Sequence, residues 1–213
     1  MKITLFGSTG DLGRECLLQS LEAGHEVTVL VRSPEKLSQA LASKITVVKG
    51  DALLIEDVMR SISKNTEAIL FAIGVDEKTS PRDLCTNATE NIIRVMRSNN
   101  VSRLIWCGGG SNILKDDVIS FGSKFVRWYA EVFLKHRHTD KEHQISLLED
   151  SDDLDWIGVR PLQMKQGIKR GKYRLGYYSY SGFSKITFAD CAHAMVNMLG
   201  DDTWVRKAPI IQY

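Results

Sequence analysis

Cysteine is scarce in this chain of 213 residues, which has four cysteines and no pair in a CxxC spacing. Wide spacing argues against a disulfide framework or a metal site and favours buried free thiols, as in a reducing compartment. No apolar run approaches the roughly 18 residues that a membrane helix needs, and no signal-peptide pattern precedes the first expected strand. We therefore expect a cytoplasmic protein with no membrane partner and no bound metal.

An excess of charge of one sign is also lacking. The chain has 28 Lys and Arg against 26 Asp and Glu, a net charge of +2, and its basic residues form no long run. This balance makes no case for a nucleic-acid partner. No repeat, low-complexity tract or linker divides the chain, whose length suits one domain. We expect residues 1–150 to form mainly a cofactor-binding half and residues 151–213 mainly a substrate half, in a monomer or small homo-oligomer.

The most informative segment is a glycine-rich turn between an expected strand and an expected helix. Residues 7–13 read GSTGDLG, after the apolar residues 2–6 and before a helical stripe of Cys16, Leu17 and Leu21. With a second strand at residues 26–31, the turn lies in a β-α-β unit of roughly 30 residues. Such glycines let a pyrophosphate approach the backbone, and the helix start offers it unpaired N–H groups. The pattern predicts a dinucleotide site; the alternative is a tight connection with no ligand.

The end of the second expected strand bears on the choice of dinucleotide. Proteins selective for NAD normally carry Asp or Glu about 20 residues past the glycines, whereas this chain has Arg32 and Ser33. A guanidinium can bind a 2′-phosphate through two hydrogen bonds, and a hydroxyl can donate a further one. The sequence therefore favours NADP(H) as cofactor, the alternative being that Arg32 is ordinary surface charge.

Apolar segments alternate with helical ones along the first two thirds of the chain. Further strands are expected at residues 45–48, 68–73, 103–107 and 154–161, and helices at 55–63, 84–98, 121–138, 141–149 and 188–199. Apolar strands separated by helices indicate parallel pairing with right-handed crossovers. We predict an α/β fold, a doubly wound parallel sheet (Rossmann fold) with a small C-terminal substrate-binding portion. In that portion we expect short hairpin-like strands at residues 173–183 and a cap on the last helix from Thr187.

Several segments, taken together and in order, resemble the atypical short-chain dehydrogenase/reductases with a compact NAD(P)H-binding domain. They are GSTGDLG at residues 7–13, VLVRS at 29–33, GD at 50–51, NII at 91–93, LDWIGVRP at 154–161 and ITFAD at 186–190. Within that group the chain looks closest to the biliverdin reductase B/flavin reductase branch and to the NmrA-like proteins. The resemblance covers nearly the whole chain.

The resemblance implies a place for each part of a bound dinucleotide. The residues around the pyrophosphate would be Gly7, Thr9, Gly10, Asp11, Leu12 and Gly13, with Arg32 and Ser33 at the 2′-phosphate. Those near the adenine would be Asp51 and Ala52, and those lining the ribose trough Phe71, Ala72, Ile73 and Gly74. Those around the nicotinamide would be Cys107, Gly108, Gly109, Pro161, Leu162 and Gln163.

The chain departs from the wider family in its proton donor, since no Tyr-x-x-x-Lys pair is present. Ser111 is a candidate donor if its loop delivers it to the site. Gln163 stands where related proteins can carry histidine; it can orient a carbonyl but cannot act as an acid at neutral pH. Hydride transfer to a flavin, quinone or tetrapyrrole survives this loss, because solvent can protonate the product. The resemblance thus implies an NADPH-dependent reductase of a small planar substrate. The main alternative is a non-catalytic NmrA-like redox sensor; an isomerase or epimerase is disfavoured by the missing pair.

Some polar residues in the second half of the chain have two possible interpretations. His136 and His138 point to different helix faces, so a surface or cap role is expected rather than metal binding. Asp140 and Lys141 either border the substrate pocket or form a solvated helix start.

The aromatic residues of the second half are also open to two interpretations. Trp128, Tyr129 and Phe133 are expected in the core, with a pocket role for one of them as the alternative. Either a roof over a planar substrate or a contact between subunits is expected from Tyr177, Tyr178 and Tyr180.

Overall fold

A computed structural model of the chain describes residues 1–180 and 183–213, and its main feature is an eight-stranded sheet in the order β3-β2-β1-β4-β5-β6-β10-β8. The strands are β1 (Lys2–Phe6), β2 (Glu26–Val31), β3 (Thr46–Lys49), β4 (Ala68–Phe71), β5 (Arg103–Cys107), β6 (Asp155–Pro161), β8 (Arg174–Gly176) and β10 (Ile210–Gln212). All neighbours pair in parallel except β8, which runs antiparallel to β10. The strand order reverses between β1 and β4, so the predicted doubly wound sheet is confirmed.

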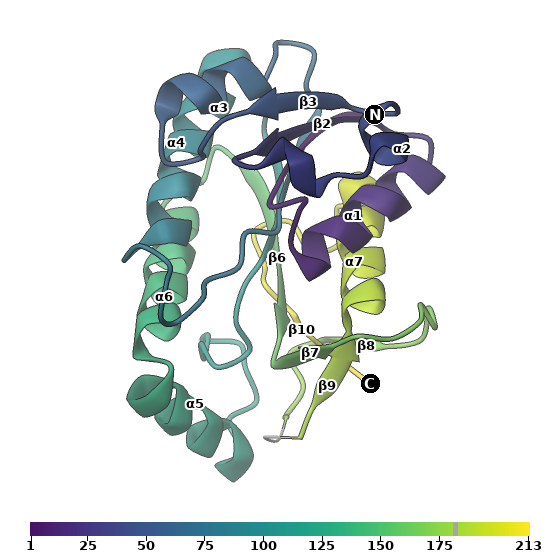
Figure 1. Ribbon diagram of the computed structural model, residues 1–213. Coiled ribbons are helices and arrows are strands. Elements are labelled where there is room, and N and C mark those ends of the chain that lie inside the picture. Colours follow the sequence, from purple (N-terminus) through teal and green to yellow (C-terminus); the bar gives the residue numbers. More distant parts are fainter. Residues whose placement is uncertain (181–182) are drawn as a thin grey trace.

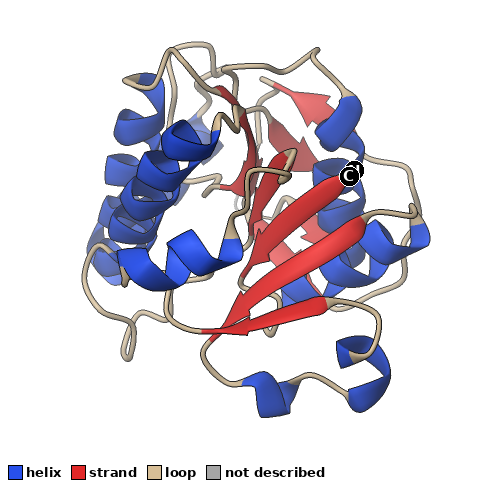
Figure 2. Ribbon diagram, turned by 90° about the horizontal axis from the view of Figure 1, so that it is seen from above, coloured by secondary structure: helices blue, strands red, loops and turns tan. Residues whose placement is uncertain are grey.

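Helices cover both faces of the sheet, as Figure 1 and the view from above in Figure 2 show. One face carries α1 (Asp11–Glu22) and α7 (Phe188–Asn197), and the other carries α3 (Ile55–Ser61), α4 (Leu84–Asn99) and α6 (Lys135–Glu149). Alternate strand residues enter the two cores: Leu5 packs with the α1 and α7 cluster, and Phe6 with the opposite one. Shorter elements are the 3₁₀ turns Pro34–Lys36 and Met198–Gly200 and the helix α2 (Gln39–Ala42).

The C-terminal part differs from the expected hairpin. β8 pairs with β10, a three-residue strand that the sequence did not indicate, because β10 supplies an edge beside β6. A second, two-stranded sheet joins β7 (Gln163–Lys165) to β9 (Lys185–Thr187) in parallel. Part of the expected hairpin, Ser181 and Gly182, lies outside the described residues. The predicted cap is confirmed, since Thr187 Oγ1 accepts a hydrogen bond from the Asp190 N–H at 3.1 Å.

The single helix expected over residues 121–138 is wrong. The structure has α5 (Phe121–Phe133) and then α6, with Leu134 between them at φ −128° and ψ 35°, outside helical values. The break is fixed by the Glu77 carboxylate, which accepts hydrogen bonds from the backbone N–H groups of His136 and Arg137 at 2.8 and 3.0 Å. These are first-turn donors of α6 that would otherwise lack partners. The helix expected from residue 141 is therefore the second half of α6.

The aromatic residues of α5 are not in the core, contrary to expectation. Trp128, Tyr129 and Phe133 are 52%, 46% and 57% exposed. The buried side of α5 consists of small or medium residues, Ser123, Val126 and Ala130. Within the described parts of the chain, no helix is long and apolar enough to cross a membrane.

Candidate functional site

A pocket of about 720 Å³ lies at the carboxyl ends of β1, β4, β5 and β6. Its walls include residues 10–12, 72–75, 107–112 and 161–164, with further side chains from α5, α6 and the start of α7. Crevices at the carboxyl ends of parallel strands are where ligands bind in doubly wound folds. The pocket thus gathers, from several strands, most of the residues singled out from the sequence. Phe71 is an exception: its side chain is fully buried in the core.

The glycine turn is shaped for a close backbone approach. Gly7 has φ +89°, and a Cβ there would lie 2.7 Å from the Ala72 carbonyl; a Cβ on Gly13 would lie 2.0 Å from the Gly7 oxygen. The N-cap residue of α1, Gly10, places no side-chain cap over the first turn. The first-turn N–H groups and the positive end of the helix dipole therefore face the pocket without a competing side chain, which fits a pyrophosphate.

A smaller cavity of about 290 Å³ adjoins the turn, on the side of residues 35–38. Its lining includes Thr9 of the turn, the cations Arg14 and Lys36, the carboxylate of Glu35 and the hydroxyl of Ser38. The two residues expected at the 2′-phosphate, Ser33 and the exposed Arg32, follow β2 and are not part of this lining. The residues expected near the adenine lie beyond β3: Ala52 is buried, and Asp51 accepts a hydrogen bond from the Leu53 N–H at 3.0 Å.

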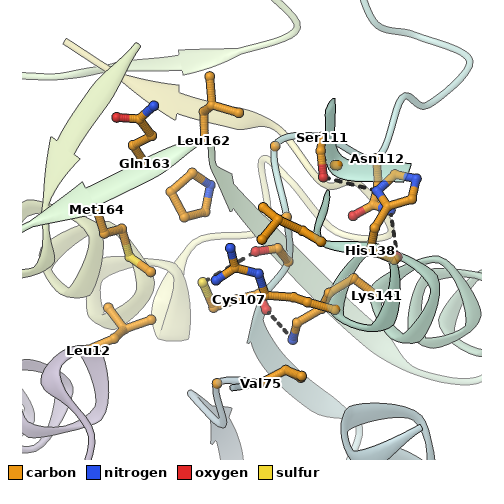
Figure 3. Close-up of a pocket in the computed structure, with 18 of the residues that line it drawn as sticks. Leu12, Val75, Cys107, Ser111, Asn112, His138, Lys141, Leu162, Gln163 and Met164 are labelled. Carbon is orange, nitrogen blue, oxygen red and sulfur yellow. Dashed lines mark hydrogen bonds between the residues drawn. The ribbon is translucent and has the colours of Figure 1, made fainter. Parts of the chain in front are cut away.

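Ser111 is delivered to the pocket by the loop after β5, where it meets a histidine from α6 (Figure 3). The Ser111 Oγ lies 3.1 Å from Nδ1 of His138, and the Asn112 amide nitrogen lies 3.3 Å from the same atom. The other ring nitrogen, Nε2, lies 3.4 Å from Oε1 of Glu142, one turn further along α6. Glu142 is in turn paired with Arg127 of α5 at 3.0 Å. Burial lowers the pKa of His138, an effect that the Glu142 charge opposes.

Lys141 is a second α6 side chain in the pocket (Figure 3). Its Nζ donates to the Cys107 carbonyl at 2.9 Å and to Gln144 Oε1 at 2.8 Å, and it lies 5.4 Å from the centre of the Phe71 ring. These partners compensate an ammonium group that is almost fully buried. A hydrogen bond with Cys191 and the charge of Lys141 lower the pKa of the Cys107 thiol despite its burial. All four cysteines are free and buried, as predicted.

The structure decides between the two interpretations of the polar residues. Lys141 borders the pocket, whereas the Asp140 carboxylate accepts from the backbone N–H groups of Cys85 and Thr86 at 2.8 and 2.9 Å and so caps α4. The surface role expected for His138 is wrong, because the turn of α6 that carries it packs under the loop after β5. A usable signal was present: His138, Lys141 and Glu142 are three and four residues apart, on one face of a helix.

The remaining aromatic residues take separate positions. Tyr129 contributes to the pocket wall. Tyr180 is buried, which raises its pKa to about 12, and the Tyr177 hydroxyl accepts from the Ala208 N–H at 3.1 Å. In the described part of the chain neither residue lines the pocket, nor does the exposed Tyr178, so a roofing role gains no support. The predicted Gln163 lies on β7, exposed at the pocket rim. Among the described residues, no group of three or more His, Cys, Asp or Glu could hold a metal.

The sheet and the glycine turn define a dinucleotide-binding protein of the Rossmann type. Its sequence matches the family model described as NAD(P)H-binding over residues 7–202, and the chain belongs to this family. It is 24% identical over 207 residues to the uncharacterized protein YwnB of Bacillus subtilis, with 93% of this chain and 92% of that protein covered.

Two solved structures show how widely the fold is shared. A provisionally assigned NADH-flavin reductase from Streptococcus pneumoniae has a TM-score of 0.73 and 21% identity, with 100% of this chain and 99% of that chain covered. A short-chain dehydrogenases/reductase from Veillonella parvula, in complex with NADP, has a TM-score of 0.78 and 14% identity, with 100% and 94% covered. The predicted resemblance to atypical short-chain dehydrogenase/reductases is thus confirmed at the level of the family and the fold.

Proposed function

We propose that this protein is an NADPH-dependent oxidoreductase that passes hydride to a small planar acceptor such as a flavin, a quinone or a tetrapyrrole. The observation that carries the proposal is the lining of one pocket, which joins residues 10–12 of the glycine turn to a set of apolar side chains. The apolar part of the lining includes Phe125, Val126, Leu162, Met164 and Phe188. When bound, the reduced nicotinamide supplies the hydride, and the protein supplies binding and alignment. The name of the streptococcal neighbour agrees with this acceptor class.

The cofactor residues are proposed as the resemblance implied them, with the whole chain acting as one NAD(P)-binding domain. The glycine turn would bind the pyrophosphate, and the ends of β4, β5 and β6 would hold the ribose and nicotinamide. Ser111 and Gln163, which both line this pocket, would contact the acceptor. Gln163 can donate an N–H to an acceptor oxygen, which would orient it.

The preference for NADPH is proposed on the cations around the smaller cavity. Arg32 and Ser33 directly follow β2, and Arg14 and Lys36 line the cavity beside the turn, together with Glu35. Calorimetric titration of the wild type and of Arg32→Ala with NADPH and NADH tests the assignment. Loss of one charged hydrogen-bond partner should weaken NADPH binding by about 1–3 kcal/mol and leave NADH binding unchanged. The control is Arg94→Ala, which removes an exposed arginine paired with Glu90 on α4. Equal losses for both dinucleotides would contradict the 2′-phosphate role.

Catalysis is tested by following NADPH oxidation over a panel of FMN, a benzoquinone and biliverdin. Turnover with at least one acceptor supports the reductase. Tight NADPH binding without turnover of any acceptor would refute it and favour a dinucleotide sensor. No binding of either dinucleotide would mean that the glycine turn is a structural connection here.

A further inference from the structure

We propose that Ser111, His138 and Glu142 form a proton relay that gives the pocket a further activity, the reversible reduction of an aldehyde or ketone to an alcohol. The inference rests on the proposed function, because the hydride comes from the same reduced nicotinamide. It goes beyond that function because a carbonyl, unlike a flavin, needs a proton delivered to one oxygen atom as hydride arrives.

The hydroxyl end of the relay is held in place by backbone hydrogen bonds to β6. The Gly108 N–H donates to the Val159 carbonyl and the Gly110 N–H to the Pro161 carbonyl, both at 2.9 Å. A Cβ on Gly110 would lie 2.9 Å from the backbone of Leu162, so this approach requires glycine. These hydrogen bonds hold the loop along β6, so Ser111 has a fixed position in the pocket wall. Fixed placement of a reacting group is what proton transfer requires.

The tautomer of His138 follows from its neighbour Asn112. The Asn112 amide nitrogen donates to the backbone carbonyl of His138 at 3.1 Å, and a carbonyl can only accept. The same NH₂ group lies 3.3 Å from Nδ1, so Nδ1 is an acceptor and the ring proton is on Nε2. The Nε2 proton then faces Glu142, and the Ser111 hydroxyl, at 3.1 Å the nearer of two donors, shares the Nδ1 lone pair with the Asn112 amide. This places a serine beside a base that has a carboxylate 3.4 Å from its other ring nitrogen.

The charges around His138 suit a group that gains and loses a proton. Glu142 on its own helix faces Nε2, and Arg127 and Glu131 face the ring from α5. Arg127 also binds both of these carboxylates, at 3.0 Å to Glu142 and 2.7 Å to Glu131. On the loop side the neighbours are the neutral Ser111 and Asn112. The buried Nε2 has no well-aligned hydrogen bond to the described residues, which leaves it free to bind Glu142 more closely when the ring is charged.

The proposed step balances atoms and electrons. A bound reduced nicotinamide would supply the hydride that forms the new C–H bond at the carbonyl carbon, and the π electrons of the C=O bond would move to oxygen. That oxygen takes the proton of Ser111, and Ser111 takes the proton that the His138 imidazolium carries on Nδ1. The substrate is reduced by two electrons and the nicotinamide is oxidised by two. Solvent then returns a proton to His138. The reverse sequence oxidises an alcohol, with neutral His138 as the base.

The test compares benzaldehyde, whose oxygen needs the relay, with FMN, which solvent can protonate. Ser111→Ala and His138→Gln should lower kcat for benzaldehyde on the order of 10²-fold relative to FMN, with little change in KM. Ser111→Thr, which keeps a hydroxyl, should recover most of this loss. The matched control is His143→Gln, which removes an exposed histidine of the same helix that pairs with Asp83 outside the pocket.

Two readouts separate a relay from a structural hydrogen bond. Benzaldehyde reduction should fall as pH rises through the His138 pKa, and benzyl alcohol oxidation should rise through the same pKa. By NMR titration without cofactor, Glu142→Gln should move the His138 pKa further down, because the carboxylate charge that opposes the effect of burial is lost.

The outcomes distinguish the two proposals. FMN reduction with no benzaldehyde reduction, or equal benzaldehyde rates in wild type and both variants, overturns the relay and leaves the reductase standing. An unchanged His138 pKa in Glu142→Gln also overturns the relay. No NADPH oxidation with any acceptor overturns the reductase, and the relay with it.

Discussion

The buried ion pair between Arg160 of β6 and Asp117 offers the most demanding test of the structure. The side chains of these residues are 0% and 2% exposed, and two Arg160 nitrogens contact the two carboxylate oxygens at 2.9 and 2.6 Å. The same guanidinium donates to the backbone carbonyls of Asn112 and Ala208. Arg160 therefore ties the sheet to the loop that carries Ser111, and Asp117 supplies the charge that makes its burial tolerable.

Asp117→Ala should leave the arginine charge buried with neutral partners. Removing one member of a buried pair costs about 3–5 kcal/mol of unfolding free energy. At about 2–4 °C per kcal/mol for a chain of this size, the unfolding midpoint should fall by about 6–20 °C. The two carbonyl contacts that remain favour the lower part of that range.

The assay is urea unfolding followed by tryptophan fluorescence, with thermal unfolding as a second measurement. Asp116→Ala is the matched control, since it removes an exposed carboxylate from the same loop and should stay within about 0.5 kcal/mol of wild type. A loss below about 1 kcal/mol for Asp117→Ala, equal to that of the control, would refute the idea that this pair is an essential part of the loop.

Two further predictions address the glycine turn and the buried imidazole. Gly13→Ala should abolish measurable NADPH binding by calorimetry, because its Cβ would sit 2.0 Å from the Gly7 oxygen, whereas Gly200→Ala, with open space around its Cβ, should bind normally. The stability of the protein should fall as pH drops from above 6.5 through the lower folded-state pKa of His138, because the unfolded chain takes up that proton first. In His138→Gln, the midpoint of thermal unfolding should fall less over this pH range. Part of the fall that remains should come from His25, because burial lowers its pKa as well. An equally steep fall in the variant would contradict the assignment.

Much of the fold could be predicted because its signals are local. The bounds expected for the strands at 26–31 and 103–107 are those of β2 and β5. Buried parallel strands are short apolar runs, and the glycine turn lies between a run of that kind and an amphipathic helix. β10 could not be predicted, because its three residues form a strand only by pairing with β6 and β8, which lie far from it in sequence.

The candidate site was predicted only in part, because the strand order places some of its residues and contacts distant in sequence place the others. Residues at strand ends could be placed, because parallel strands bring their carboxyl ends to one edge. Ser111 was expected on condition that its loop delivered it, and the loop does so through bonds to β6 that no local pattern shows. Trp128 and Phe133 were expected in the core because apolar spacing on a helix normally marks a buried face, but both side chains are more than half exposed.

His138 and Lys141 were the hardest to predict because α6 does not follow the rule that buried faces are apolar. The helix buries both residues together with Asp140 and Gln144, all polar. The burial is tolerated because each group meets a partner from elsewhere: Asp140 caps α4, and Gln144 accepts from Lys141 while donating to Thr89 at 2.7 Å. A sequence pattern shows the polarity of these side chains but not their partners, which lie up to 55 residues away. Buried polar helix faces of this kind occur where function outweighs the preference for an apolar core, and two residues of this face, His138 and Lys141, line the pocket.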